Sequence, residues 1–311
     1  MPEWVWETGI GETRAALIAD GRIVEAAIEL DDGGSRVGHV ARARLIDRAT
    51  GRVRLDSGDE ALLNGAAGVP EGGTITVAIV REAIREPGRL KLPRATMTDA
   101  PPASGPDLVA RLTATGVPLR QLRSHQCDDE LEAAGWSELL EEATTGTIAF
   151  PGGALDMTPT PAMTLFDVDG GPPLENLAIT AAKAVAEAIR RHAIGGSIGI
   201  DFPTLPGKAP RQAVAAALDA HLLPPFERTT VNGFGFLQIV RPRPRMSLPE
   251  LLRADPIGAA ARAALRRLER EPGPSRPHRL PAAVLARLHA QPGWLAELAR
   301  RTGHPPQLET A

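Results

Sequence analysis

The chain has 311 residues, 43% of them apolar and 23% charged, and its formal net charge is −3. These values are typical of a globular protein and give no global signal of a basic, nucleic-acid-binding chain. No apolar run reaches the roughly 18 residues of a membrane helix. The single cysteine, Cys127, excludes an intramolecular disulfide and a zinc site built from several cysteines. We therefore expect a cytoplasmic protein with no membrane partner.

Short extended runs fill the first third of the chain. Residues 4–29 predict a β-hairpin around the turn sequence ADG, and residues 36–94 predict the closely spaced strands of a small barrel. The composition of residues 98–106 predicts a linker. Arginines crowd the barrel block, where they form either a solvated face or a phosphate-binding surface. They are Arg36, Arg42, Arg44, Arg48, Arg52 and Arg54.

A strand–helix–strand pattern occupies the middle of the chain. Residues 162–169, AMTLFDVD, predict a strand that finishes in two carboxylates, and residues 174–192 predict an Ala-rich helix that stops before two glycines. Residues 197–202, SIGIDF, predict a second strand that also finishes near an acid. Because a βαβ unit makes its strands parallel, the acids of both strands should meet at one edge of the sheet.

The acids at this edge are Asp167, Asp169 and Asp201. Neighbouring carboxylates repel one another unless a cation holds them, and Mg²⁺ uses one or two protein carboxylates together with substrate phosphate. Such an ion activates water for phosphodiester cleavage. The alternative is structural: Asp167 and Asp169 cap a turn before two glycines, and Asp201 only ends a strand. The residues alone leave both possibilities open.

The rest of the chain predicts further helices and one further strand. Residues 210–223 predict another helix, residues 232–245 predict a strand flanked by arginines, and residues 247–311 predict short helices around a Pro-rich break. The arginines Arg241, Arg243 and Arg245 form a second cluster after this strand.

Several of these motifs occur in an order that resembles the ribonuclease E/G family. The matching stretches are GIGETRAALIADGRIVEAAIE near the start, then GTIAFPGGALDMTPTPAMTLFDVDGG, RRHAIGGSIGIDF and NGFGFLQIVRPR. Residues 36–94 resemble the inserted OB-fold domain of that family. The resemblance covers about four-fifths of the chain.

The resemblance implies a Mg²⁺-dependent endoribonuclease that cleaves single-stranded RNA with metal-activated water. The family's two metal-binding aspartates fall on Asp167 and Asp201, and its neighbouring asparagine is replaced by Asp169, a further candidate catalytic residue. Candidate RNA contacts are Arg42 and Arg44 in the barrel block and Arg190, Arg241 and Arg243 in the core motifs.

The implied fold is α+β: an RNase H-like domain with an inserted OB-fold β-barrel, followed by a DNase I-like α/β catalytic subdomain and a small helical C-terminal tail. On this sequence the RNase H-like part covers residues 1–35 plus 100–155 and the OB-fold covers 36–94. The catalytic subdomain covers 156–245, and the helical segment covers 246–311.

Three departures from the family pattern set further expectations. Only a short segment stands where the family's 5′-monophosphate sensor should lie, so we expect no 5′-end sensing. The paired cysteines of the family's zinc link are missing, so we expect no zinc-linked dimer. The barrel block contains no aromatic residue, so its binding of RNA would rest on arginine and phosphate. These losses leave a second hypothesis open, an RNA-binding protein of the same family with a weak or inactive site.

Overall fold

The computed structural model describes residues 1–31, 34–65, 68–86, 88–123, 129–271 and 277–311, and Cys127 lies outside them. The chain divides into two units. Unit 1 comprises Met1–Gly33, Leu108–Glu138 and Leu252–Ala311. Unit 2 comprises Gly34–Asp107 and Leu139–Leu251.

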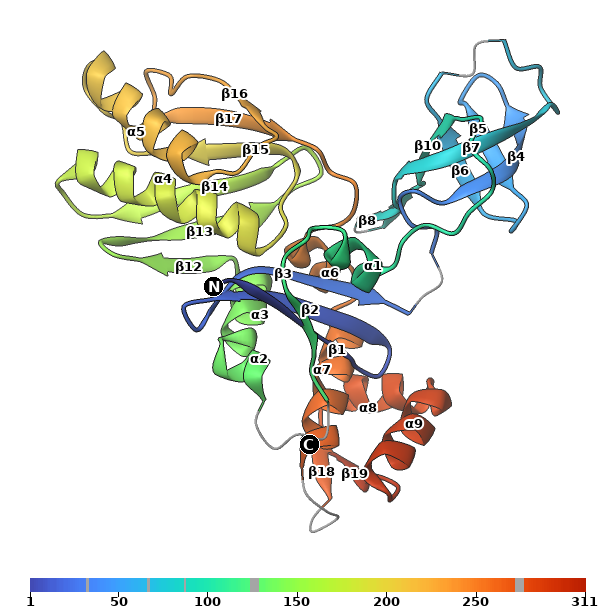
Figure 1. Ribbon diagram of the computed structural model, residues 1–311. Coiled ribbons are helices and arrows are strands. Elements are labelled where there is room, and N and C mark those ends of the chain that lie inside the picture. The colour runs from blue at the N-terminus through green and yellow to red at the C-terminus, as the bar shows by residue number, and fades with distance from the viewer. Residues whose placement is uncertain (32–33, 66–67, 87, 124–128, 272–276) are drawn as a thin grey trace. The chain divides into compact units, whose positions relative to one another are not determined.

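Unit 1 begins with three antiparallel strands, β1 (Glu3–Thr8), β2 (Glu12–Ala19) and β3 (Arg22–Leu30), and β11 (Leu119–Gln121) adds parallel to β1 (Figure 1). The hairpin predicted around ADG is confirmed as β2–β3, but its first extended run consists of two strands. The run breaks at Gly11, where φ is +79° and a Cβ atom would lie 2.5 Å from the ring of Trp294. Only glycine accommodates both constraints.

Helices complete unit 1. A core cluster forms where α7, α8 and α9 pack together, with Ile10, Leu265 and Leu288 among its buried side chains. The predicted short helices of the tail are therefore confirmed. Their bounds and those of the neighbouring elements are α1 (Leu108–Thr113), α2 (Glu130–Ala133), α7 (Pro256–Arg270), β18 (His278–Leu280), α8 (Ala282–His289), α9 (Pro292–Thr302) and β19 (Leu308–Thr310). Two helices cross the division between the units, α3 (Trp136–Thr145) and α6 (Leu248–Ala254).

A closed barrel of five strands forms the first part of unit 2, which confirms the small barrel predicted from residues 36–94. Alternation explains its core, because every second residue of β4 points inward, as Ala43 and Leu45 do, while Arg42 and Arg44 point outward. The barrel strands are β4 (Val40–Asp47), β5 (Arg52–Leu55), β6 (Glu60–Leu63), β7 (Thr74–Arg81) and β10 (Arg94–Met97). A small hairpin, β8 (Ile84–Glu86) and β9 (Arg89–Lys91), precedes β10.

A six-stranded sheet forms the second part of unit 2, in the order β12-β13-β14-β15-β17-β16 (Figure 1). The predicted βαβ unit is confirmed, because β14 and β15 are parallel and joined through α4. The strands are β12 (Thr147–Phe150), β13 (Gly153–Pro159), β14 (Thr164–Gly170), β15 (Gly196–Asp201), β16 (Glu227–Arg228) and β17 (Phe236–Arg241). The helices are α4 (Leu174–Arg191) and α5 (Lys208–His221).

Side-chain alternation decides which face of this sheet is covered. The apolar residues of the central strands, such as Phe166, Ile200 and Leu237, share one core with Ala181 and Val185 of α4. The intervening residues lie on the opposite face, where the acids of β14 and β15 are exposed. The helices therefore bury one face, and the carboxylates occupy the other.

The division into units falls at other residues than the predicted domain segments. Residues 139–155 carry β12 and the start of β13, so they belong to the six-stranded sheet rather than to the N-terminal part. Residues 252–311 belong to unit 1 together with β1–β3 rather than standing alone. No helix in the described part of the chain is both long and apolar enough to pass through a bilayer.

A buried polar contact closes the carboxyl end of α4. Burial raises the pKa of Glu142, but hydrogen bonds and charge from His192 and Arg191 outweigh it and hold that pKa below its ordinary value. The His192 Nε2 atom lies 3.1 Å from the Glu142 carboxylate. His192 is fully buried, and burial lowers the pKa of its ring despite the carboxylate.

These shifts predict loss of stability in acid. Both groups have a lower pKa in the folded chain, so the unfolded chain binds more protons and the free energy of unfolding falls as the pH is lowered. The histidine contribution is lost as pH drops below about 6.5 and the glutamate contribution below about 4.5. His192→Gln should show a smaller stability loss than wild type between about pH 7 and pH 5 in urea titrations.

The control for this experiment is His289→Gln, at an exposed position. It should follow the wild-type pH dependence. An equal pH dependence in wild type and His192→Gln would contradict the assignment of the acid sensitivity to His192.

Candidate functional site

Three carboxylates form a row across neighbouring strands of the six-stranded sheet. Asp167 on β14 is the direct Cα partner of Asp201 on β15, and on its other side it is the partner of Asp156 on β13. Direct partners share a face of the sheet, with Cα atoms about 5 Å apart. We call these three residues the acid row, and Asp167 with Asp201 the acid pair.

The acid pair is exposed, and no described cationic side chain forms an ion pair with it. Asp167 and Asp201 are both exposed on the face opposite the helices. Within the described ranges, neither carboxylate forms an ion pair or a hydrogen bond with another residue. Like charges directly opposite each other in a sheet are destabilising. An external cation would relieve this repulsion, so the geometry favours binding one.

The structure does not show Asp167 and Asp169 capping a turn. Strand β14 continues through Gly170, so Asp167 and Asp169 lie within the strand rather than in a turn after it. Neither carboxylate accepts a backbone hydrogen bond from any residue that the structure describes. The two acids therefore have no structural partner of their own.

The acid pair fits a divalent cation as a two-carboxylate site. Among the described residues, no group of three or more His, Cys, Asp or Glu side chains is placed to hold a metal ion. Mg²⁺ commonly binds through one or two carboxylates, with water and phosphate oxygens filling its remaining positions. The predicted ligands Asp167 and Asp201 are thus brought together, and they would hold such an ion in cooperation with substrate.

Asp169 is set apart from the pair. It lies on the same face as Asp167, two residues further along β14, and its strand partner is Ala154 on β13. The pairing of β14 with β15 ends at Asp167 and Asp201, so Asp169 has no partner on β15. Its charge adds to the acid row from the strand end.

The three core arginines lie at the opposite end of the sheet from the acid pair. Arg241 on β17 pairs with Gly196 at the start of β15, whereas Asp201 ends that strand, about 16 Å away along it. Arg190 lies in the last turn of α4, which runs back from β14 to that same start. The side chain of Arg243 packs against Gly195 and Gly196 and pairs with Glu250. A phosphate at the acid pair cannot contact these arginines.

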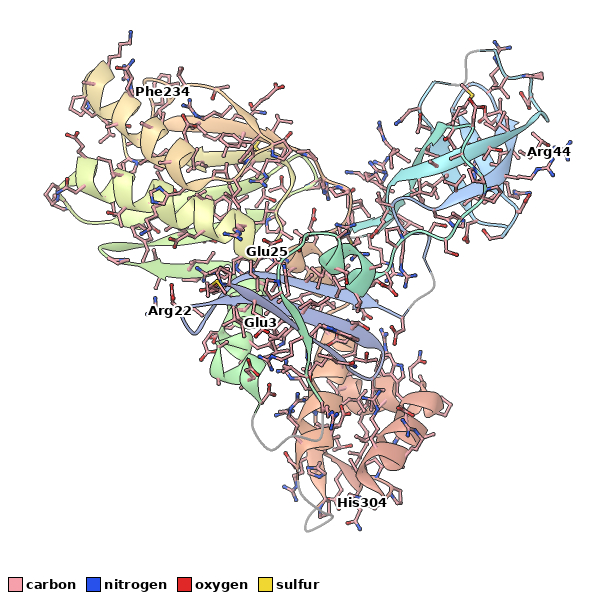
Figure 2. The ribbon with its side chains drawn as sticks, viewed as in Figure 1. Glu3, Arg22, Glu25, Arg44, Phe234 and His304 are labelled. Atoms are coloured by element: carbon pink, nitrogen blue, oxygen red, sulfur yellow. The ribbon has the colours of Figure 1, made fainter. Side chains whose placement is uncertain are left out.

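The barrel arginines divide into two that share one carboxylate and two without an ion pair in the described part of the chain. Arg52 and Arg54 both pair with Glu60, and their hydrogen bonds lower the pKa of that carboxyl. Arg44, labelled in Figure 2, donates from Nε to the carbonyl of Gly72 at 3.2 Å and keeps its charge. Arg42 is exposed and has no partner within the described ranges. The free positive charge of the outer β4 face therefore rests on Arg42 and Arg44.

Asp156 was missed by sequence reasoning because it lies in the middle of a strand. The signal that could have found it is the tight connection between β13 and β14, residues 160–163. An antiparallel hairpin around this connection places Asp156 opposite Asp167. A motif search along the chain does not reveal such cross-strand neighbours.

Comparison with known proteins assigns nothing to this site. No protein-family model matches the chain, and a search of the curated proteins finds no match. The site is therefore defined by its own chemistry. It consists of two unpaired carboxylates in direct register on the uncovered face of a sheet, within a unit that also carries an arginine-bearing barrel.

Proposed function

We propose that this protein is a Mg²⁺-dependent endoribonuclease that cleaves single-stranded RNA and does not sense a 5′-monophosphate. The observation that carries the proposal is the direct register of Asp167 and Asp201 on neighbouring parallel strands. Both are exposed and lack a cationic partner among the described residues. Paired carboxylates that need a cation suit chemistry on a phosphodiester, which brings its own oxygen ligands.

The residues of the chain bind the metal ion and position the RNA strand. Asp167 and Asp201 bind the ion, and the uncovered sheet face leaves room for an RNA strand beside them. When bound, Mg²⁺ lowers the pKa of a coordinated water and neutralises charge that develops on the phosphate. Asp156 and Asp169 add negative charge on the same face and so strengthen cation binding without joining the pair.

The proposed architecture follows the resemblance to the ribonuclease E/G family. The closed five-stranded barrel is compatible with its inserted OB-fold. We infer that the six-stranded sheet is the DNase I-like catalytic part and that β1–β3 with α7 form the RNase H-like part. The barrel joins the catalytic sheet through residues 98–146, which include α1 to α3 and no separate β-domain in the described ranges. We propose that 5′-end sensing is absent, on the ground of the short segment 98–107 in the sequence.

One assay tests the function. The purified chain is incubated with an internally labelled, A/U-rich single strand in Mg²⁺ or in EDTA. Internal cleavage products that require Mg²⁺ are expected. Equal product in EDTA, or digestion only from an end, would contradict the proposal.

An RNA-binding protein with an inactive site is the second candidate. The observation that favours it is Asp169, which stands where the resembling family has asparagine. The replacement removes an amide donor and adds a charge. Binding of the single strand without Mg²⁺-dependent cutting would favour this candidate over the enzyme.

The barrel face offers a separate prediction. Arg42→Ala should reduce the slope of log affinity against log salt by about 0.7, the value for one neutralised phosphate on a single strand. The measurement is RNA binding by fluorescence anisotropy over a series of salt concentrations. Arg120→Ala is the control, because two carboxylates, Glu3 and Glu130, already compensate that exposed charge, and its slope should stay near wild type. An unchanged slope in Arg42→Ala would remove this face from the RNA surface.

A further inference from the structure

One large apolar side chain in unit 2 stands almost fully in solvent. Phe234 is 85% exposed, the highest value among the large apolar side chains of the described residues after the chain's first residue. It lies in the loop between β16 and β17, where Figure 2 labels it. Two residues later, Phe236 is the direct strand partner of Asp201. The exposed ring therefore stands beside the strand end that carries the acid pair.

The loop holds this ring on a fixed backbone. The side-chain oxygen of Asn232 accepts hydrogen bonds from the amides of Phe234 at 2.9 Å and Phe236 at 3.0 Å. Gly235 has a φ of +98°, and a Cβ atom there would lie 2.0 Å from the carbonyl oxygen of Phe202. The backbone on both sides of Phe234 is thus tightly constrained. The loop can therefore present the ring to a ligand without first being ordered.

A cationic cavity of about 520 Å³ opens next to this loop. It is lined by α5, by β16 and by Thr230 of the Phe234 loop. Arg228 is neutralised by Asp219, its Nε lying 2.6 Å from that carboxylate. Lys208 and Arg211 have no anionic partner in the described part of the chain. This cavity, which we call the α5 pocket, therefore keeps a net positive charge.

The end of the α5 pocket that Lys208 lines lies at the same edge of the sheet as the acid pair. Lys208 opens α5 directly after the loop that follows Asp201. The pocket lies on the face of the sheet that α5 covers, and the acid pair lies on the other face. Strand β16 is two strands from β15, about 10 Å across the sheet, and its Arg228 lies level with Ile198, about 10 Å along the strand from Asp201. A nucleic-acid strand would therefore run from the acid pair around the edge of the sheet to Lys208. An extended nucleic-acid strand can cover this distance within a few nucleotides.

We propose that Phe234 and the α5 pocket form a nucleotide subsite at the sheet edge that carries the acid pair, on the path of an RNA strand that passes around this edge. The ring of Phe234 stacks on the base next to the cleaved phosphodiester, and Lys208 and Arg211 bind a phosphate further along the strand. This subsite rests on the proposed function. The acid row repels the RNA backbone, and the cations of the α5 pocket offset this repulsion. The barrel block has no aromatic residue for base stacking, and Phe234 supplies one.

The test measures RNA binding in EDTA, where cleavage plays no part. Phe234→Ala should weaken binding of an A/U-rich single strand about 5- to 150-fold, which corresponds to the 1–3 kcal/mol of one stacked base. Phe234→Trp should keep wild-type affinity. The double variant Lys208→Ala with Arg211→Ala should lower the salt slope by about 0.7 for each phosphate that these two side chains neutralise. Ile257→Ala, at an exposed apolar position in unit 1, is the matched control and should change neither value.

The outcomes separate this subsite from the catalytic proposal. Weakened binding by Phe234→Ala in a chain that does not cut RNA would support the subsite and contradict the enzyme. Normal Mg²⁺-dependent cutting with unchanged binding by Phe234→Ala would overturn the subsite and leave the enzyme standing. A change of oligomeric state in Phe234→Ala, with unchanged RNA affinity, would instead make the ring an interface between copies and would also overturn the proposal.

Discussion

Replacing Asp167 or Asp201 with asparagine is expected to slow Mg²⁺-dependent RNA cleavage at least about 100-fold. Asparagine keeps the shape of the side chain but removes the charge that binds the ion. A metal ion contributes several kcal/mol to stabilising a phosphoryl transition state, and every 1.4 kcal/mol lost is a tenfold lower rate. Because the two residues are direct strand partners, the double variant should be hardly slower than either single variant. Single-turnover cleavage of a labelled strand measures each rate.

Asp156→Asn is the matched control for these variants. It lies in the same row and on the same face, but Asp167 separates it from Asp201. Its effect on the cleavage rate should be much smaller. A cleavage rate in Asp167→Asn equal to that of wild type would contradict the assignment of the acid pair as the metal site.

Thermal unfolding tests Mg²⁺ binding at the acid pair without relying on cleavage. Mg²⁺ should raise the melting temperature of wild type, because a ligand of the folded state stabilises it by mass action. Mg²⁺ should raise the melting temperature of Asp201→Asn much less. Without Mg²⁺, Asp201→Asn should be at least as stable as wild type, since it removes repulsion between unpaired neighbours.

Elements with a strong local pattern could be predicted from the sequence. The Ala-rich stretch of α4 repeats buried positions such as Ala181, Val185 and Ile189 at helical spacing, and two glycines follow its end. The strands on either side alternate or run apolar, so the βαβ unit and the meeting of Asp167 with Asp201 followed from local signals. The barrel was also predictable, because its strands are short and turn sequences separate them.

Those patterns could not predict which residues of different helices and strands lie at the same end of the sheet. Arg190 and Arg241 were predicted as RNA contacts because they occur in the same motifs as the acids. The helix α4 runs opposite to its strands, and β17 runs opposite to β15, so both arginines lie at the far end of the sheet. The direction of each element, rather than its identity, decides which residues share a site.

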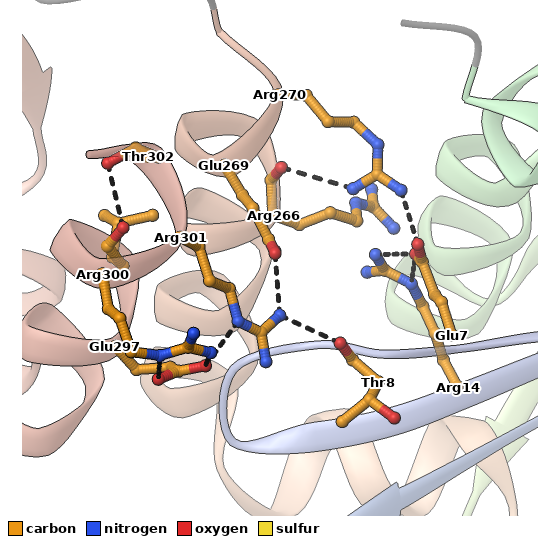
Figure 3. A network of polar contacts seen from close by, with 11 residues as sticks. Glu7, Thr8, Arg14, Arg266, Glu269, Arg270, Glu297, Arg300, Arg301 and Thr302 are labelled. Atoms are coloured by element: carbon orange, nitrogen blue, oxygen red, sulfur yellow. Dashed lines mark hydrogen bonds and ion pairs between the residues drawn. The ribbon is translucent and has the colours of Figure 1, made fainter. Parts of the chain in front are cut away.

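The division into units depends on contacts between residues that are distant in the sequence. Arg262 of α7 donates to Glu12 of β2 at 2.9 Å, across 250 positions of the chain. No local pattern connects these segments, so the tail was predicted as a separate C-terminal helical segment. The buried charges between β1, β2 and α7 are what join it to the N-terminal strands (Figure 3).

Glu7 is the centre of this network. It is 1% exposed, and its carboxylate pairs with the equally buried Arg14 and, at 2.6 Å, with Arg270. Arg270 also contacts Asp129 at 3.0 Å. Burial together with the charge of Arg14 lowers the pKa of the neighbouring Arg266 to about 10. The arginines outnumber their buried partners here, so the cluster depends on the charge of Glu7.

Glu7→Gln should therefore lower the free energy of unfolding by about 3–5 kcal/mol, the cost of leaving a buried charge uncompensated. Arg270 keeps Asp129, but the fully buried Arg14 loses its close partner and keeps only Glu12, 3.7 Å away, and the amide that replaces the carboxylate carries no charge. Urea denaturation gives the difference directly. Glu130→Gln is the matched control, because that pair with Arg120 is largely exposed and should contribute less than about 1 kcal/mol. Similar losses in the two variants would mean that the buried network does not hold the C-terminal helices to β1 and β2.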